Sequence, residues 1–224
     1  AFLQRVEYAN QNYREFEKGM RSDRGRIYVR FGPPDEISPE VIEASRLFEH
    51  VNNRPLADPR LRLHVDDALA FLKLTRTKYD VIISEPSNPW RAGIGNLFTT
   101  EFFQLCKERL RDNGLMVQWL QLYEIDDEAF RLVVRTFRSV FPHITVWQSL
   151  TKDVIFVGST EPIRIDEEKL VQKLTGAAVK ADLARIQVLD AATLLSLQMI
   201  SEKPLREYAS DGPLNTEDKP LLEH

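Results

Sequence analysis

The sequence is poor in the residues that mark disulfide-bonded and metal-binding proteins. Cys106 is the single cysteine among 224 residues, so no disulfide can form within the chain. It lies between Phe103 and Leu110 in a helical pattern, where a buried and inert thiol is expected. The four histidines are scattered without the spacing of metal ligands, and we expect no metal site. A reducing, cytoplasmic setting is therefore predicted.

Strong charge and long apolar runs are also missing. The formal net charge is −4, with 30 basic residues interspersed among 34 acidic ones, so no surface for nucleic acid or anionic lipid is expected. The apolar runs are shorter than the ~20 residues that cross a bilayer, and we expect no membrane span. A hydrophobic content of 43% is enough to fill the core of one or two globular domains.

Strand and helix patterns alternate along the middle of the chain. The segments LRLHV, YDVIIS and LMVQWLQ have strand patterns, and a helical pattern follows each of them. This alternation predicts a mostly parallel sheet of the Rossmann type. The next two strand patterns, ITVWQSL and DVIFVGS, are separated by two residues only, which predicts a terminal antiparallel hairpin. Together these features predict an α/β methyltransferase-like fold.

The two ends of the chain have simpler patterns. Apolar residues at helical spacing predict an N-terminal amphipathic helix over residues 2–18, and RIYVRF alternates as a short strand. Ser38, followed by Pro39 and Glu40, has the pattern of a helix start. Residues 161–224 are predicted to form short helices and an extended tail. The chain begins at Ala1, inside a helical pattern, which suggests that it is part of a longer product.

Polar side chains follow several of the predicted strands. Glu36, Asp67 and the pair Glu85 with Asn88 stand where ligands bind in open parallel sheets, outside the carboxyl ends of the strands. A carboxylate there suits a ribose diol, and one beside a small residue such as Ala68 suits an adenine amino group. The alternative is that Asp67 and its neighbour cap the helix that follows.

The loop SEPSNPW has the composition of a binding loop rather than a simple connection. Two prolines make it rigid, and rigid loops commonly position functional groups. Glu85 could take a proton from an attacking amine, Asn88 could hold that amine, and Trp90 could exclude water. The alternative is that Glu85 is only solvated and that Trp90 belongs to the core.

Five segments resemble the spermidine synthase (polyamine aminopropyltransferase) family, in the right order from residue 36 to residue 224. They are EISPEVIEASRLF, DPRLRLHVDDALAFL, YDVIISEPSNPW with LFTTEFF, GLMVQW, and LNTEDKPLLEH. The resemblance implies a methyltransferase-like Rossmann sheet. It also implies decarboxylated S-adenosylmethionine or S-adenosylmethionine as co-substrate, no metal, a small-molecule amine as second substrate, and a homodimer.

The same resemblance implies roles for particular residues. Glu36 matches the acid that holds the ribose, and Asp67, followed by Ala68, matches the acid that reads the adenine. Glu85 stands where these enzymes carry their catalytic Asp. The remaining matches are implied substrate-binding residues: Asn88, Trp90, Gln118 and Asp218.

Two features depart from that family. Asn88 is neutral where the family has a second Asp, which weakens the expectation of a simple diamine substrate. The nine glycines include no G-x-G-x-x-G loop, so the predicted sheet is incomplete. Residues 1–37 instead resemble the family named for its Gly-Trp-x-Thr-Asp (GWxTD) motif, with Met20 and Ser22 at two motif positions. The two patterns meet at Glu36, which suggests a chimaeric chain.

Three domains or segments are therefore predicted: residues 1–37 as a GWxTD-like helix and strand, residues 38–160 as the Rossmann-like core, and residues 161–224 as its helical extension. The leading functional hypothesis is transfer of an aminopropyl group to an amine, by an intact or degenerate site. One alternative is a non-catalytic structural or interaction remnant. Another is an S-adenosylmethionine-dependent methyltransferase.

Overall fold

The computed structural model describes residues 39–51, 54–65, 67–86, 89, 93–150 and 152–222. The chain divides into two compact units, residues 1–68 and residues 69–224. The predicted domain boundaries at residues 37 and 160 stay predictions. The helix expected over residues 2–18 and the strand RIYVRF lie outside the described residues.

The described part of the first unit is helical. It contains α3 (Pro39–Ser45), followed directly by the 3₁₀ helix η2 (Arg46–Phe48), and then η3 (Pro55–Ala57). The helix predicted to start at Pro39 is thus confirmed. The strand predicted for LRLHV is wrong, because residues 61–65 form no strand and Leu61, Leu63 and Val65 are all exposed. Alternating apolar residues favour a strand only where a neighbouring strand accepts their backbone hydrogen bonds.

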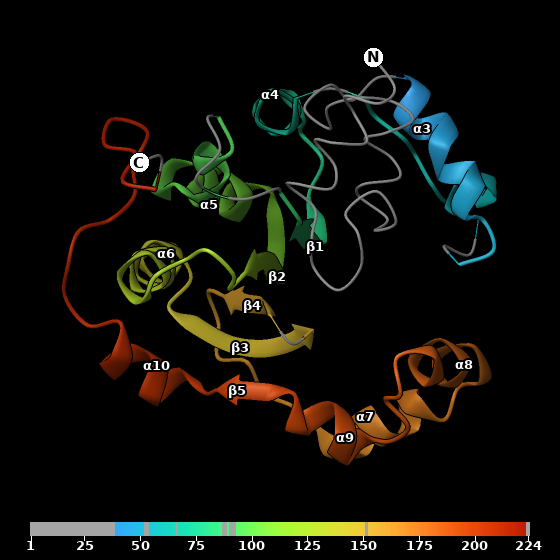
Figure 1. Ribbon diagram of the computed structural model, residues 1–224. Coiled ribbons are helices and arrows are strands. Elements are labelled where there is room, and N and C mark those ends of the chain that lie inside the picture. The colour runs from blue at the N-terminus through green and yellow to red at the C-terminus, as the bar shows by residue number, and fades with distance from the viewer. Residues whose placement is uncertain are drawn as a thin grey trace. The chain divides into compact units, whose positions relative to one another are not determined.

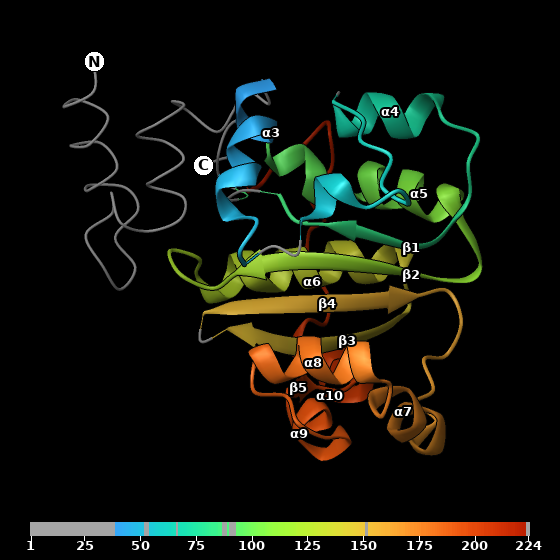
Figure 2. The ribbon, with the colours of Figure 1, turned by 90° about the vertical axis from the view of Figure 1, so that its right-hand side faces the viewer.

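The second unit is built on a five-stranded sheet (Figures 1 and 2). Its strand order is β1-β2-β4-β3-β5. The bounds are β1 Tyr79–Ser84, β2 Leu110–Gln121, β3 His143–Leu150, β4 Asp153–Ser159 and β5 Gln198–Ile200. The α/β class and the antiparallel hairpin of β3 and β4 are confirmed. Among the described residues only β1 and β2 pair in parallel, and the other three pairings are antiparallel, so the expected majority of parallel pairs is not found there.

Helices accompany the sheet of the second unit. Figures 1 and 2 show α5 and α6 along one face of the sheet. The helices of this part are α4 Ala68–Leu74, η4 Gly95–Phe98, α5 Thr100–Arg109, α6 Asp127–Val140, α7 Glu167–Leu174, α8 Ala177–Arg185, α9 Ala191–Ser196 and α10 Glu202–Tyr208. The helical pattern expected after LMVQWLQ is confirmed as α6. Asp126 caps this helix, because its Oδ1 accepts from the Ala129 amide at 2.7 Å.

A bulge separates the two halves of β2. Tyr79 pairs with Leu110, but Val81 pairs with Leu115, so β2 holds residues 111–114 outside the regular ladder. Asn113 has φ 60° there, in the left-handed region that asparagine tolerates. Residues 111–114 therefore form a bulge inside the strand.

Aromatic rings fill the core between the sheet and the two covering helices. Phe137 of α6 is completely buried and meets Phe103 of α5 edge to face, with ring centroids 4.9 Å apart. It also contacts Phe141 at 5.2 Å and Phe156 of β4 at 5.9 Å. Such pairs add to the burial of apolar area, so this cluster fixes α5 and α6 on the sheet.

Gly158 of β4 lies directly against this cluster. A Cβ atom there would stand 2.7 Å from Cζ of Phe137 and 2.9 Å from Cβ of Phe141. We expect Gly158→Ala to lower the free energy of unfolding by about 1 to 3 kcal/mol, because rings packed on all sides cannot move away. Urea unfolding measures this, with Gly176→Ala as the control, since a Cβ atom there would stand 3.3 Å from the Lys173 carbonyl oxygen. Equal unfolding curves for both variants would contradict the close packing.

Cys106 of α5 is buried completely, as its helical context predicts. Burial raises the pKa of its thiol to about 12. The thiolate fraction at pH 8 is then about 10⁻⁴, and we expect the native chain to resist an aromatic disulfide reagent over hours, while urea-unfolded chain reacts within minutes. Rapid reaction of the native chain would show that α5 opens readily.

Candidate functional site

The carboxyl ends of β1 and β2 bring two of the predicted site residues to the same edge of the sheet. Ser84, the last residue of β1, pairs with Gln118 of β2, and Glu85 follows Ser84 directly. Glu85 is exposed, so its carboxylate is accessible to a ligand. Parallel strands present their carboxyl ends to bound ligands, and Glu85 and Gln118 both have this position.

Gln118 has a side chain that the protein satisfies only in part. It is completely buried, and its Nε2 donates to the Trp119 carbonyl at 3.1 Å. Its Oε1 is buried without a hydrogen-bond partner. An unpaired buried acceptor costs about 1 to 3 kcal/mol, so Oε1 of Gln118 is an acceptor that a further donor would satisfy.

Gln121, three residues further along β2, is a residue that the sequence did not single out. It is also completely buried, and neither its Nε2 nor its Oε1 has a hydrogen-bond partner. It is the last residue of the strand. Glutamine at the end of a strand is common on surfaces, so only its burial distinguishes this side chain.

The structure describes only some of the other predicted site residues. Glu36, Asn88 and Trp90 lie outside the described residues. Asp67 and Ala68 belong to the first unit, where both are exposed and stand at the start of α4. Their roles toward adenine stay predictions, and so does the alternative that Asp67 caps the helix.

Asp218 lies in an exposed turn of the C-terminal tail. The amide of Lys219 donates to the carbonyl of Thr216 at 3.2 Å, which closes the turn. The turn docks on the first turn of α5, where the Glu217 amide donates to Oε2 of Glu101 at 3.1 Å. Because α5 starts at the edge where β1 ends, the tail reaches the edge of the sheet that carries Glu85. The Asp218 side chain is exposed there.

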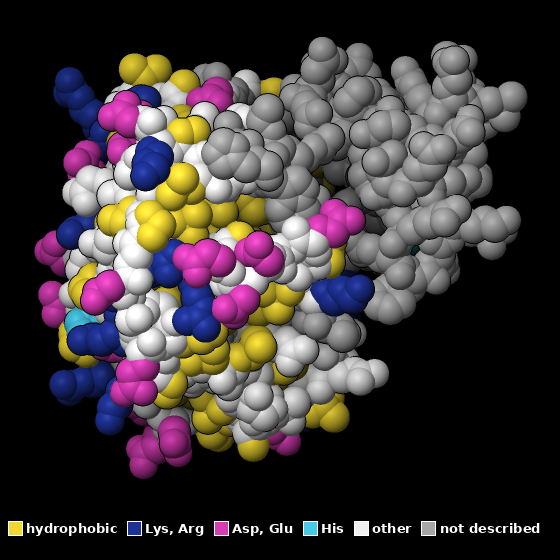
Figure 3. Space-filling model, turned by 60° about the vertical axis from the view of Figure 1, so that its left-hand side comes forward, with side chains coloured by type: hydrophobic (Ala, Val, Ile, Leu, Met, Phe, Trp, Pro, Cys, Tyr) yellow, Lys and Arg dark blue, Asp and Glu magenta, His cyan; other side chains and the backbone are white. Residues whose placement is uncertain are grey.

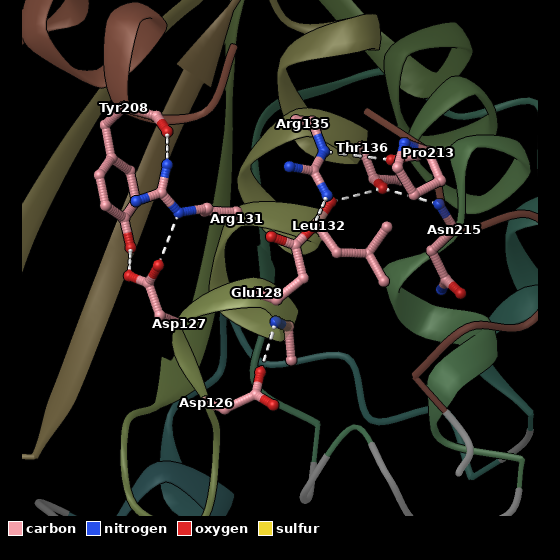
Figure 4. A network of polar contacts seen from close by, with 11 residues as sticks. Asp126, Asp127, Glu128, Arg131, Leu132, Arg135, Thr136, Tyr208, Pro213 and Asn215 are labelled. Carbon is pink, nitrogen blue, oxygen red and sulfur yellow. Dashed lines mark hydrogen bonds and ion pairs between the residues drawn. The ribbon is translucent and has the colours of Figure 1, made fainter. Parts of the chain in front are cut away.

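Asn215, in the same tail, makes a buried set of hydrogen bonds that the sequence did not predict. Its Nδ2 donates to the carbonyls of Gly95 and Phe98, at 3.3 and 3.2 Å, and its Oδ1 accepts from the Leu221 amide at 2.8 Å. Its backbone amide donates to Oγ1 of Thr136 at 2.9 Å (Figure 4). Its carbonyl accepts from the Thr100 amide at 3.0 Å. The tail thus fixes η4, the end of the loop that begins at Glu85.

Two arginines of α6 donate hydrogen bonds to the chain just before Asn215, at Tyr208 and Pro213. Arg131 donates to Oδ2 of Asp127 at 2.7 Å and to the Tyr208 carbonyl, and its guanidinium lies 4.1 Å from the centre of the Tyr208 ring (Figure 4). Arg135 is buried and donates to the Pro213 carbonyl at 3.2 Å and to Oε1 of Glu128 at 2.5 Å.

The Tyr208 hydroxyl donates to Oδ1 of Asp127. Burial, together with that hydrogen bond, raises the pKa of Tyr208 to about 12. The same hydrogen bond and one from Arg131 lower the pKa of Asp127. Both shifts keep Tyr208 neutral and Asp127 charged at neutral pH, so this contact strengthens the anchoring of the tail.

Within the described residues no group of three or more His, Cys, Asp or Glu side chains could hold a metal ion. No helix in the described part of the chain is both long and apolar enough to cross a bilayer. On the face shown in Figure 3, basic and acidic side chains alternate over the described residues, with hydrophobic side chains between them.

The family model of the spermine/spermidine synthase domain matches residues 36–155. The chain belongs to this family. Glu85 and Gln118 lie inside the matched range, so the edge of β1 and β2 is the family domain's own edge. Residues 1–56 match a second family model, the GWxTD domain, and the two matches overlap after Glu36.

Curated relatives of this spermidine synthase-like chain are polyamine aminopropyltransferases. One from Buchnera aphidicola subsp. Acyrthosiphon pisum (strain Tuc7) is 31% identical over 115 residues, which are 51% of this chain and 40% of that protein. One from Caldicellulosiruptor saccharolyticus is 32% identical over 107 residues, 48% of this chain and 38% of that protein. The chain therefore spans about 40% of the length of these relatives.

Solved structures share the fold. A spermidine synthase from Thermotoga maritima superposes with a TM-score of 0.59 at 21% identity, covering 78% of this chain and 58% of that one. A spermidine synthase in complex with the transition state analogue AdoDATO gives a TM-score of 0.57 at 20% identity, covering 78% and 57%. These similarities confirm the spermidine synthase-like Rossmann fold.

Proposed function

We propose that this chain is a transferase domain that moves an aminopropyl group from decarboxylated S-adenosylmethionine to an amine, with Glu85 as the general base. Membership of the spermidine synthase family supports the reaction class. The observation that carries it is the pairing of Ser84 with Gln118, which places the exposed Glu85 and Gln118 at the carboxyl ends of two neighbouring parallel strands.

The chemistry is a direct displacement. The nitrogen of a neutral amine attacks the methylene carbon next to the sulfonium; a C–N bond forms, the C–S bond breaks, and sulfur keeps the electron pair as a thioether. The proton lost by the amine passes to the carboxylate of Glu85. An alkylamine has a pKa near 10.4, so at neutral pH almost all of it carries the extra proton, and a nearby base raises the reactive fraction.

Gln118 fits the role of an orienting group. Its Oε1 can accept an N–H of the incoming amine, and a buried acceptor holds the nitrogen in a fixed direction. Trp90, Asn88 and Asp218 complete the proposed amine site, and Glu36, Asp67 and Ala68 the proposed nucleoside site.

A second candidate is a non-catalytic remnant. The chain spans about 40% of its aminopropyltransferase relatives, and its sequence has no G-x-G-x-x-G loop. A helix N-terminus and backbone amides that such a loop supplies normally strengthen nucleoside binding.

Titration calorimetry on the full chain separates these candidates. We expect decarboxylated S-adenosylmethionine or S-adenosylmethionine to bind with a Kd at or below the millimolar range. Mass spectrometry should then find aminopropylated product when decarboxylated S-adenosylmethionine and cadaverine are both present. Absence of binding heat with both nucleosides at millimolar concentration, together with absence of product, would reject the transferase and favour the remnant.

A further inference from the structure

The three helices that follow β4 have almost no core of their own. We call residues 161–197, which contain them, the α7–α9 segment. The helices α7, α8 and α9 have 8, 9 and 6 residues, and none of these residues is buried. The structure describes the whole segment, and Val188 is its single buried residue. Helices shorter than ~12 residues are marginal in water and depend on packing of an apolar face, which the segment lacks.

The α7–α9 segment instead exposes its large apolar side chains. Because α7 contacts both α8 and α9, the three helices form one cluster. An exposed apolar residue that stands alone is common and needs no explanation. Here five lie within residues 165–189, each between 43% and 70% exposed: Ile165, Val171, Val179, Ile186 and Leu189. Apolar exposure of this density is typical of a surface that contacts another protein.

The charged side chains of this surface carry both signs, in separate places. Residues 165–189 contain four acidic and four basic side chains, so their formal net charge is zero. Asp166 pairs with Lys169 at 2.9 Å, and Asp182 pairs with Arg185 at 3.2 Å. Within the described residues, two acids at the start of α7 and two lysines further along form no ion pair: Glu167, Glu168, Lys173 and Lys180.

We propose that the α7–α9 segment is the contact surface between two copies of this chain. In a twofold symmetric dimer the same surface faces itself in the opposite orientation, so each contact occurs twice. Glu167 and Glu168 of one copy then face Lys173 and Lys180 of the other. A surface of one charge sign would repel its own copy, whereas separated charges of both signs attract it. The exposed apolar side chains supply the buried area that a single chain lacks.

The order of the strands keeps this surface away from the proposed site. Among the described residues β5 forms one edge of the sheet, and β1, which ends just before Glu85, forms the other. α9 contacts β5, and Figures 1 and 2 show α7, α8 and α9 at that end of the sheet. A dimer through the α7–α9 segment therefore leaves Glu85 accessible, and the inference does not depend on the proposed function.

Light scattering on the full chain, after size-exclusion chromatography at micromolar concentration, measures the mass. We expect twice the 25.9 kDa of a single chain. The double variant Lys173→Glu with Lys180→Glu should be monomeric, because acidic side chains then face acidic ones. Glu167→Lys with Glu168→Lys should be monomeric for the opposite reason. An equal mixture of the two variants should regain the double mass, which a variant that merely failed to fold could not do.

Two further variants separate the surface from general effects. Lys107→Glu is the control, because Lys107 is exposed in the last turn of α5 as Lys173 is in the last turn of α7, and it should keep the dimer. Leu189→Ser should raise the Kd of the dimer about tenfold or more, because its side chain would be buried only in the dimer. Below that Kd its urea unfolding should match the original chain.

Four results would overturn the inference. A single-chain mass at every concentration tested rejects the second copy as the partner. A double mass that both charge-reversed variants keep, or a mixture that stays monomeric after each has lost the dimer, rejects the charged contacts. An unchanged Kd in Leu189→Ser rejects the apolar contact. None of these results bears on aminopropyl transfer, because Glu85 stands at the other edge of the sheet.

Discussion

Replacing Glu85 with glutamine is expected to lower kcat for aminopropyl transfer by about 10²- to 10⁴-fold, the usual contribution of a general base. Glutamine keeps the size and the hydrogen-bonding oxygen of the side chain but cannot take the amine proton at neutral pH. KM should change little, because Glu85 is exposed and acts on the proton rather than on substrate affinity. Initial rates with decarboxylated S-adenosylmethionine and cadaverine measure the effect.

The pH dependence separates loss of a base from loss of structure. As the pH approaches 10, more of the amine is already neutral, and the deficit of Glu85→Gln should become smaller. Glu207→Gln, an exposed position on α10, is the control and should match the original chain. A deficit below threefold at neutral pH, or one that stays constant up to pH 10, would remove Glu85 from the role of base.

Asn215→Ala is expected to lower the free energy of unfolding by about 3 to 5 kcal/mol, the range found when a buried hydrogen-bond network is broken. The variant leaves the carbonyls of Gly95 and Phe98 and the amide of Leu221 without their partners. Asn215→Asp should be about as damaging, because a carboxylate oxygen would then face two carbonyl oxygens. Urea unfolding followed by circular dichroism measures both variants.

Asp218→Asn serves as the matched control for the tail. Asp218 is three residues away and exposed, so its substitution should change stability by no more than about 0.5 kcal/mol. If Asn215→Ala stayed within 1 kcal/mol of the original chain, water would have to replace the lost partners, and the tail would not be fixed to η4 as described.

Local patterns predicted the elements that depend on neighbours in sequence. The helix Asp127–Val140 has its own capping aspartate and apolar face, and the hairpin of β3 and β4 has alternating residues on both sides of a short turn. The segment LRLHV has the same local signal, yet it forms no strand, because alternation alone does not supply a neighbouring strand.

The site was predictable to a similar degree. The alternation of strand and helix patterns predicts that Glu85 and Gln118 lie at the carboxyl ends of neighbouring strands, and the pairing of Ser84 with Gln118 agrees with it. Asn215 was not predictable, because its importance comes from burial and from a partner 120 residues away. The tail motif predicted a role for Asp218. The tail side chain that is buried and hydrogen-bonded through both its Nδ2 and its Oδ1 is Asn215, three residues before it.

The long separation between Asn215 and its partners sets an order of events during synthesis. Gly95 is made 120 residues before the amide that holds its carbonyl. At 5 to 20 residues per second, the ribosome takes roughly 6 to 24 s to cover that stretch. During this time β1, α5 and α6 can form and pack, but the loop after Glu85 has no anchor at η4. A nascent chain stalled before residue 215 should therefore contain the aromatic core and lack an ordered site, which proteolysis of stalled chains can detect.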